Sequence, residues 1–331
     1  MTTTRFENTN TSVLKSLPGR ILHSPVFGSV VALLVAIIIF SAMSPRFLAP
    51  ANLSLILQQS VVVGILAVAQ TLIILTAGID LSIGAIAVLG TIVLAQAAAG
   101  IGPVGAMVIA MIVCVGLGAL NGALVTVLRL PPFIVTLGTF TAIVAATRLL
   151  AGSETYQVTS PLLTFLGNTF KIGTFTTTYG VVVMLLVYAI MGYALTQTAW
   201  GRHVYAVGGN PNGALLSGVK TRRNMFSVYI VSGVIALIAA WAALGRISTA
   251  DSNAYQNANL DTITAVVIGG TSLFGGRGGV LGTLIGTLII GVLRSGLTLA
   301  GVDSLYQNIA TGALVIVAVA VDQFTRRRTS R

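Results

Sequence analysis

The stretch GRHVYAVGGNPNGALLSGVKTRRN, residues 201–224, is the longest polar segment between two strongly apolar parts of the chain. It contains no acid, and its basic side chains are Arg202, His203, Lys220, Arg222 and Arg223. Lys and Arg that flank membrane spans are retained on the cytoplasmic side. The stretch therefore predicts a helical membrane protein in which this segment is a cytoplasmic loop.

Within this loop, the residues Asn210-Pro211-Asn212-Gly213 have the composition of a turn, because Pro fixes its own φ and Asn and Gly tolerate positive φ. Residues 214–219 then predict a short helix that ends at Gly218. Such an element either docks a soluble partner or is part of a solvated loop, and the residues alone leave both interpretations open.

The composition of the whole chain agrees with a membrane protein. Of its 331 residues, 55% are apolar and 8% are charged, with a mean hydropathy of +0.97, whereas soluble domains average about 25% charged residues. This excludes a soluble enzyme. The net charge of +11 does not indicate nucleic acid, because the basic residues flank apolar runs and are better explained by membrane orientation and anionic lipid headgroups. The single Cys114 predicts neither a disulfide framework nor a metal site.

A helix needs about 20 apolar residues to cross the hydrocarbon core of a bilayer. About ten segments are candidates, at 26–43, 53–76, 82–100, 104–128, 132–150, 177–197, 225–245, 261–274, 278–300 and 306–322. The chain is thus expected to divide into a cytoplasmic tail (1–25), a membrane domain (26–323) with its cytoplasmic loop (198–224), and a basic cytoplasmic tail (324–331).

The distribution of Lys and Arg predicts the orientation. Ten crossings that begin inside place both termini in the cytoplasm. Of the 18 Lys and Arg residues, 13 then lie on the inner side, and the other five are Arg46, Arg148, Lys171, Arg246 and Arg294. This excess on the inner side supports the orientation. The outer loops 151–178 and 247–260 face either an external delivery protein or water.

The number of spans also predicts an internal repeat. The second to fifth and the seventh to tenth spans form two four-helix units separated by one helix, which gives them opposite orientations, as in inverted-repeat transporters. The clearest internal match, TAGIDLSIGAIAVLGT (76–91) with IGGTSLFGGRGGVLGT (268–283), pairs two spans that run the same way. The sequence match therefore does not support the inverted repeat.

Asp80 and Ser82 interrupt two apolar runs. A charged Asp at mid-bilayer costs about 2.5–3.5 kcal/mol, so Asp80 needs a partner, a wet cavity or an interfacial position. The two residues either cap the start of the third span or line a translocation path. Uncharged polar residues also lie inside predicted spans, where they either line the path of a polyhydroxyl solute or join helices. They are Gln58, Gln59, Gln70 and Asn121.

Glycines at helical spacing predict close contacts between spans. They are Gly118 and Gly122 in one segment and Gly278, Gly282 and Gly286 in another. No Lys-Ser/Thr pair follows a Gly-rich run, so a phosphate-binding loop is not expected.

The chain lacks the residue patterns of an enzyme. It contains no Ser/His/Asp order, HExxH motif or paired intramembrane carboxylates. We therefore expect no catalytic residues, no metal and no cofactor bound by this chain. Ion-driven carriers keep charged relays inside the membrane, and Asp80 is the single candidate here. The driving energy is expected to come from another protein.

Four stretches resemble the membrane permease of bacterial ABC importers for monosaccharides of the ribose, xylose and galactofuranose type. They are AQTLIILTAGIDLSIGAIAVLG (69–90), NGALVTVLRLPPFIVTLGTF (121–140), GRHVYAVGGNPNGALLSGV (201–219) and DTITAVVIGGTSLFGGRGGVLGTLIGTLIIGVL (261–293). The resemblance covers about residues 45–323. It implies an all-α integral membrane protein of the type II importer fold, with about ten spans and two four-helix pseudo-repeats, in the bacterial cytoplasmic membrane.

The resemblance also implies partners. They are a second permease chain, identical or a sister, ATPase subunits that bind ATP and Mg²⁺, and an external sugar-binding protein. The cytoplasmic loop would supply a coupling helix that sits in a cleft of the ATPase. The residues that would form it are Gly209, Asn210, Pro211, Gly213, Ala214, Leu215, Leu216, Ser217 and Gly218.

Three positions depart from the family pattern. After Asn210-Pro211 the family usually has an acid, paired Ala and an Arg, whereas this chain has Asn-Gly-Ala-Leu-Leu, which predicts less polar contacts with the ATPase. The departures at 257–260 and 294–297 leave the substrate open. The alternatives are a permease for branched-chain amino acids or another small solute, and an independent secondary carrier or channel.

Overall fold

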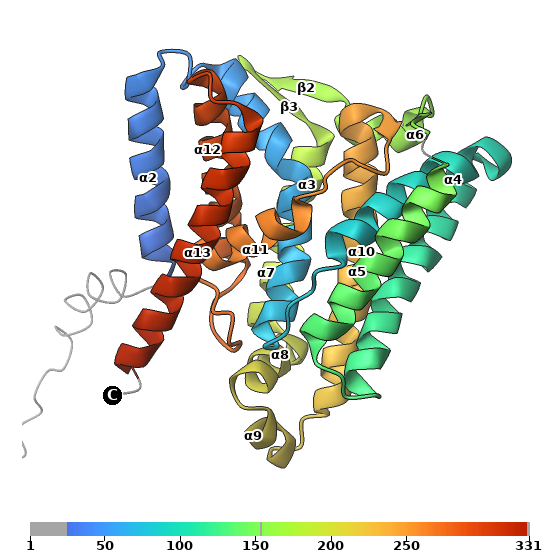
Figure 1. The fold of residues 1–331 in the computed structure, drawn as a ribbon, viewed down its shortest axis with the longest axis vertical. Helices are drawn as coiled ribbons and strands as arrows, with labels where there is room; N and C mark the ends of the chain where they lie inside the picture. The colour runs from blue at the N-terminus through green and yellow to red at the C-terminus, as the bar shows by residue number, and fades with distance from the viewer. Residues whose placement is uncertain (1–24, 153, 330–331) are drawn as a thin grey trace, which may run out of the picture.

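The computed structural model describes residues 25–152 and 154–329. In Figure 1 the long helices run roughly vertically and side by side. Their bounds are α2 (Pro25–Met43), α3 (Pro50–Leu75), α4 (Ile83–Thr126), α5 (Pro132–Ala151), α7 (Tyr179–Gln197), α10 (Thr221–Ile247), α12 (Val280–Leu299) and α13 (Ser304–Thr329). By length and composition, seven helices in this part of the chain are able to cross a membrane.

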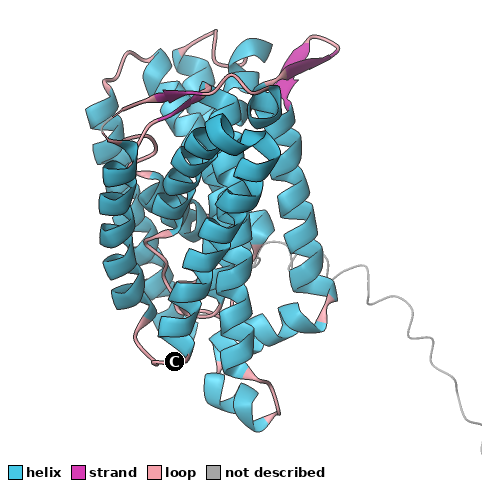
Figure 2. Cartoon of the chain, turned by 90° about the vertical axis from the view of Figure 1, so that its right-hand side faces the viewer, coloured by secondary structure: helices cyan, strands magenta, loops and turns pink. Residues whose placement is uncertain are grey.

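Short elements join these helices. The helical ones are α6 (Pro161–Thr164), the 3-10 turn η1 (Phe165–Gly167), α8 (Ala199–Gly209), α9 (Pro211–Leu216) and α11 (Ala258–Ile268). The strands β1 (Tyr156–Gln157) and β4 (Thr249–Ala250) pair antiparallel, as do β2 (Thr169–Ile172) and β3 (Phe175–Thr178). Figure 2 shows the strands at one end of the bundle, and Figure 1 shows α8 and α9 projecting from the other end.

The long helix α4 is a hairpin of two antiparallel halves. It breaks at Gly102, where φ is 75° and ψ is 168°, immediately before Pro103. Gly accepts this conformation without a steric penalty, and Pro provides no N–H to continue the helix. The halves then pack on each other, since the Cys114 thiol donates to the carbonyl oxygen of Ile86 at 3.8 Å. The two halves correspond to the segments predicted at 82–100 and 104–128.

The expected span at 261–274 is wrong as a full crossing. The helix in this region, α11, has 11 residues and is about 16 Å long at 1.5 Å per residue, roughly half of the 30 Å hydrocarbon core. A non-helical, Gly-rich segment follows it before α12 begins at Val280. The hydropathy of 261–274 therefore reflects burial among other helices as well as membrane depth.

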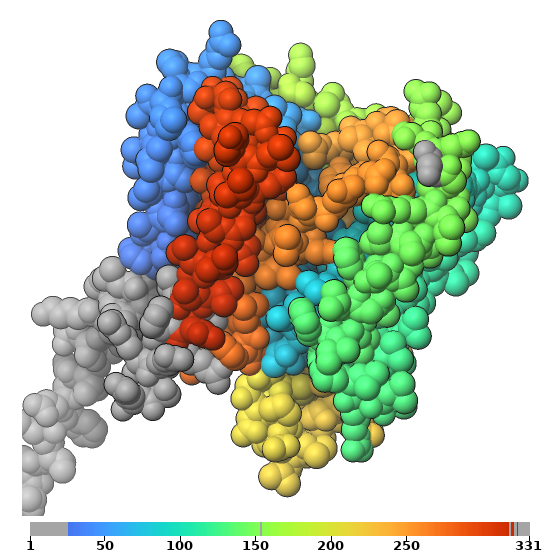
Figure 3. All heavy atoms as spheres, in the orientation of Figure 1, coloured from blue at the N-terminus to red at the C-terminus, as the bar shows by residue number. Residues whose placement is uncertain are grey.

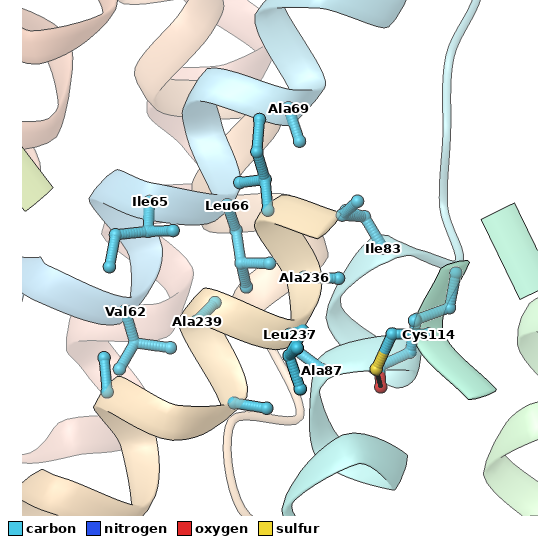
Figure 4. Close-up of a cluster of buried hydrophobic side chains, with 14 of the residues drawn as sticks. Val62, Ile65, Leu66, Ala69, Ile83, Ala87, Cys114, Ala236, Leu237 and Ala239 are labelled. Carbon is cyan, nitrogen blue, oxygen red and sulfur yellow. Dashed lines mark hydrogen bonds between the residues drawn. The ribbon is translucent and has the colours of Figure 1, made fainter. Parts of the chain in front are cut away.

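The interior of the bundle is formed by α3 and α10. Their most apolar windows are 83% and 72% buried, against 17% for α2 and 22% for α5. Figure 4 shows α10 between the other two helices of the core, with Ala236 facing between Leu66 of α3 and Ile83 of α4. Small Ala side chains on α10 let three helix backbones approach closely, which is the usual basis of helix association in membranes.

Glycine backbones lie in close contact with neighbouring helices at most of the predicted packing positions. A Cβ at Gly118 would lie 2.5 Å from the Tyr229 carbonyl oxygen, and one at Gly122 would lie 2.9 Å from the Tyr229 Cβ. Gly282 and Gly286 of α12 face the backbone of Gly269 and Ala265 in the same way. Gly278 differs from the expectation: it precedes α12 and packs on Thr271 with a φ of 115°.

Gly118 and Gly116 on α4 provide a matched test of this packing. We expect Gly118→Ala to destabilise the protein by about 1–3 kcal/mol, because the methyl group meets backbone that has no flexible side chain to move away. Gly116→Ala has no atom within 4 Å of its new methyl group and should leave stability unchanged or raise it by about 0.5–1 kcal/mol. Thermal unfolding of both purified variants measures the difference, and equal midpoints would contradict the assignment.

Candidate functional site

The cytoplasmic loop forms a helical hairpin of α8 and α9 outside the bundle. The Asn210 Oδ1 accepts the N–H of Gly213 at 2.9 Å and caps α9, and Pro211 occupies its first turn. At the other end, the N–H of Val219 donates to the Ala214 carbonyl at 3.0 Å, and Gly218 adopts a φ of 84°. The predicted short helix and its Gly218 end are confirmed, although the helix begins at Pro211, three residues earlier than expected.

The tip of this hairpin is apolar although the loop is polar. Leu215 is 60% exposed and Leu216 is 89% exposed. Ala214 is buried against the rest of the protein and fixes the direction in which α9 projects. Exposed basic residues flank α9 along the chain, namely Arg202, His203, Lys220, Arg222 and Arg223. Two exposed Leu side chains on a rigid, capped helix form a small surface suited to docking.

Backbone contacts tie the hairpin to the bundle at a point we call the glycine junction, formed by Gly208, Gly275 and Gly276. The N–H of Gly276 donates to the Leu75 carbonyl at the end of α3, at 3.0 Å. A Cβ at Gly276 would lie 2.7 Å from the Cα of Gly209, and a Cβ at Gly275 would lie 2.8 Å from the N of Ala77. Three separate chain segments therefore meet here through backbone rather than side chains.

A tyrosine supports the glycine junction from α8. The Tyr205 hydroxyl donates to the Gly278 carbonyl oxygen at 2.9 Å. Burial raises the pKa of Tyr205, so the hydroxyl stays protonated and able to donate.

Asp80 lies in a buried polar network at the start of α4. Its Oδ1 accepts from the N–H and the hydroxyl of Ser82, at 2.6 and 2.7 Å. The Asn121 Nδ2 donates to the Ser82 Oγ at 2.8 Å. All three side chains are at most 1% exposed. Asp80 thus accepts a backbone N–H at the start of the helix, which agrees with one of the two interpretations from the sequence. The expected cap by Ser82 is wrong, because the Ser82 side chain accepts no N–H of the helix.

The three glutamines of α3 lie in different surroundings. The Gln58 Nε2 donates to the Ser54 Oγ at 2.8 Å, and Gln58 and Gln59 are both half-buried. Gln70 is fully buried, and neither of its amide atoms has a partner within the described structure. A buried amide of this kind needs water or another polar group.

A cavity of about 200 Å³ opens between α5, the first half of α4 and the segment that precedes α11. Figure 3 shows that segment (orange) beside α5 (green). The polar and aromatic residues of its wall include Phe140, Arg148, Ser252, Gln256 and Asn259. None of the six predicted path residues is on this wall. The feature of the sequence that could have pointed to this cavity is the polar outer segment 247–260, which supplies three of these five residues.

The floor of the cavity joins two helix starts. The Gly84 N–H, in the first turn of α4, donates to the Asn259 Oδ1, in the first turn of α11, at 2.7 Å. Both helices therefore begin inside the protein, beside the same cavity, and direct the positive ends of their dipoles toward it.

A second buried acid was missed by the sequence reasoning. The Arg294 Nη2 contacts both carboxylate oxygens of Asp261, at 2.7 and 2.8 Å, and joins α12 to α11. Asp261 is 3% exposed. The charge distribution predicts Arg294 to be an outer charge, but in the structure it neutralises a buried carboxylate. The 33-residue separation along the chain gives no local signal for this pair.

Comparison with known proteins identifies the family. Residues 52–319 match the family described as the permease component of branched-chain amino acid transport systems. The chain belongs to this permease family. It is 43% identical to the fructose import permease protein of Rhizobium meliloti, over 97% of this chain and 92% of that protein. The ribose import permease protein of Bacillus subtilis is 38% identical, over 89% and 92%.

A third relative of the permease is the D-allose transport system permease protein of Escherichia coli K12, which is 36% identical over 90% of this chain and 91% of that protein. No solved structure matches the chain significantly. The relatives and the apolar helices together show a multi-pass membrane permease, a transport subunit rather than an enzyme.

The buried position of Asp80 leads to a testable difference between two carboxylates of the permease. Asp80→Ala leaves the Ser82 N–H and hydroxyl without their acceptor in a buried place, and we expect a loss of about 1–3 kcal/mol in unfolding free energy. Asp303 accepts the Leu305 N–H at 2.8 Å in the same local geometry but is exposed, so Asp303→Ala should change stability by less than about 0.5 kcal/mol. Unfolding in detergent compares them, and an equal effect would refute the role of Asp80.

Proposed function

We propose that this permease is the membrane subunit of an ATP-driven ABC importer for a monosaccharide. The observation that carries the proposal is the 43% identity to a fructose import permease over nearly the whole of both chains. Relatives named for ribose and D-allose support the same substrate class. The amino-acid alternative has the name of the broader family in its favour. The wall of the cavity, however, offers no carboxylate to an ammonium group.

The charge inventory of the membrane part supports an external source of energy. In the described part of the chain, the two buried acids are Asp80 and Asp261. The first is held by hydrogen bonds at a helix start, and the second is paired with Arg294. An ion-driven carrier needs groups that bind and release a cation during the cycle, whereas both of these acids already have structural partners. ATP and Mg²⁺ would be bound by a separate ATPase subunit.

We assign the ATPase-docking role to the tip of α9. Both Leu215 and Leu216 are exposed, and Leu215 stands where the family usually has an Arg, which fits a more apolar cleft in the partner. The glycine junction then carries the motion of α8 and α9 to the end of α3 and to the segment before α12, because backbone contacts have no side-chain freedom to absorb a displacement.

The two broken helices support an inverted repeat and about ten membrane segments. After α3 the chain turns at Ala77, with a φ of 61°, and re-enters the protein to begin α4. After α10 it turns at Ser248, with a φ of 52°, and re-enters to begin α11. The Gly84–Asn259 hydrogen bond joins the two re-entrant starts. Discontinuous helices in corresponding positions of two halves are typical of transporters that alternate access around a central site.

This arrangement also supports an orientation and a set of partners. The hairpin of α8 and α9 and both termini would lie in the cytoplasm, with the strands outside a bacterial cytoplasmic membrane. An external sugar-binding protein would dock at the strand end, which includes the segment 247–260. A second permease chain, identical or a sister, would complete the translocation path.

The proposal is tested with the reconstituted transporter. The permease is co-expressed with the ATPase and the binding protein encoded beside it and placed in proteoliposomes. We expect uptake of D-fructose or D-ribose that requires ATP on the hairpin side and persists without an ion gradient. Uptake of L-leucine but neither sugar would favour the amino-acid alternative, and uptake by the permease alone on an ion gradient would overturn the ABC assignment.

The docking role of α9 is tested at Leu216. Leu216→Glu places a charge in the apolar contact, and we expect the amount of ATPase subunit that co-purifies with the permease to fall at least about tenfold, since an unpaired buried charge costs several kcal/mol. Leu216→Met keeps an apolar side chain of similar volume and should retain most of the binding. Because Leu216 is 89% exposed, folding should be unaffected in both variants, and equal ATPase recovery would remove the assignment.

A further inference from the structure

We propose that the cavity between α4, α5 and the segment before α11 is a binding site for a single monosaccharide within the permease itself. The inference rests on the proposed function and extends it, because it assigns sugar contacts to this chain in addition to those of the external binding protein. The contacts are an apolar wall around Phe140 and a polar wall that contains Ser252, Gln256 and Asn259.

The size and the two-sided wall fit one sugar ring. The cavity of about 200 Å³ has the volume of about six or seven waters at roughly 30 Å³ each. Its apolar side comes from α4 and α5, with Val88, Phe140 and Val144. A pyranose or furanose has C–H groups on its faces and hydroxyl groups at its rim, so a wall with one aromatic side and one amide side matches both.

Two amide side chains of the wall have donors available for a polar ligand. Asn259 is 8% exposed, and its Oδ1 is occupied by the Gly84 N–H, whereas its Nδ2 has no hydrogen-bond partner among the described residues. The Gln256 side chain is exposed, and its Nε2 makes one long contact, 3.3 Å to the Asn253 Oδ1. The Asn259 Nδ2 is not shut off from solvent, so both amides can donate to a molecule in the cavity. A sugar hydroxyl both accepts and donates hydrogen bonds, so it satisfies amide donors and acceptors alike.

The charge of the wall separates a sugar from an amino acid. Arg148 is the charged residue on the wall, and its nearest polar contact is the Asn253 Oδ1 at 3.5 Å. No acid accompanies it on the wall. An α-amino acid carries an ammonium group that would be desolvated here without a carboxylate partner, whereas a neutral polyhydroxyl ligand needs no counter-charge and gains hydrogen bonds from the guanidinium.

The site is held in place before a ligand arrives. The Asp80–Ser82–Asn121 network fixes the start of α4 immediately before Gly84 in the chain. The Gly84–Asn259 hydrogen bond then positions the amide that faces the ligand. Tyr255 of the wall adopts a φ of 53°, a conformation that a non-Gly residue keeps only where surrounding structure enforces it. Preorganised contacts of this kind reduce the entropy cost of binding.

The site is tested by cysteine protection in the assembled permease–ATPase complex in nanodiscs. Cys114, which is buried, is first replaced with alanine (Cys114→Ala). Ser252→Cys then places a thiol on the wall, and its rate of labelling by a small maleimide is measured with and without millimolar D-fructose or D-ribose. We expect one of the sugars to slow labelling about threefold or more, while L-leucine has no effect. Asn257→Cys, which is exposed on the same segment but off the wall, should be labelled at one rate throughout.

A second pair of substitutions, in the Ser252→Cys background, tests the aromatic wall. Phe140→Leu should abolish most of the protection, and Phe133→Leu, at an exposed position of α5 outside the cavity, should retain it.

If the complex imports sugar with ATP but neither sugar protects Ser252→Cys or Gln256→Cys, the site is refuted and the proposed function stands. Protection by L-leucine alone refutes the sugar class. A complex that imports no sugar refutes the proposed function instead.

Discussion

The structure depends on one constraint: a backbone polar group in hydrocarbon must find its partner inside the protein. This chain breaks its helices within the bundle and meets the constraint with specific partners. The Ser82 N–H is satisfied by Asp80, the Gly84 N–H by Asn259, and the Gly276 N–H by the Leu75 carbonyl. Irregular backbone at membrane depth is tolerated where it is buried in protein or lines a cavity, and the cavity lies at two of these breaks.

The same constraint explains which polar residues are structural. Asp80, Ser82 and Asn121 are within the membrane part but off the wall of the cavity, because their hydrogen bonds hold the start of α4. The side chains left with capacity for a ligand belong mainly to the segment before α11. The site that we propose would separate two tasks: buried charged groups maintain the broken helices, and the amides, Phe140 and Arg148 of the cavity wall would contact the solute. In the proposed importer, the ATPase would deliver its energy through the hairpin of α8 and α9.

Much of the helical layout was predictable, because apolar length and turn residues are local properties. The hairpin in α4 follows from Gly102-Pro103, and the end of α9 follows from Gly218. Tertiary features were not predictable. In a bilayer, apolar side chains that face lipid and those that face protein have similar hydropathy. Hydropathy therefore predicts a full span where the structure has the half-length α11. The Asp261–Arg294 pair and the cavity wall each join segments distant in sequence, and no periodicity reports such distances.

The position of α11 links the docking surface to the cavity. At its start, Asn259 forms the floor of the cavity with Gly84, and beyond its end the chain runs into the glycine junction, where Gly275 and Gly276 lie against α8. The helix is about 16 Å long and is braced on α12 by the Asp261–Arg294 pair. We therefore expect a displacement of α8 that shifts the junction to be passed through α11 to Asn259. A separation of Asn259 from Gly84 would open the floor and misalign the amide contacts of the sugar that we propose there, so that opening of the path would also weaken binding. This coupling needs glycine at the junction, because a flexible side chain there would absorb the displacement before it reached the cavity.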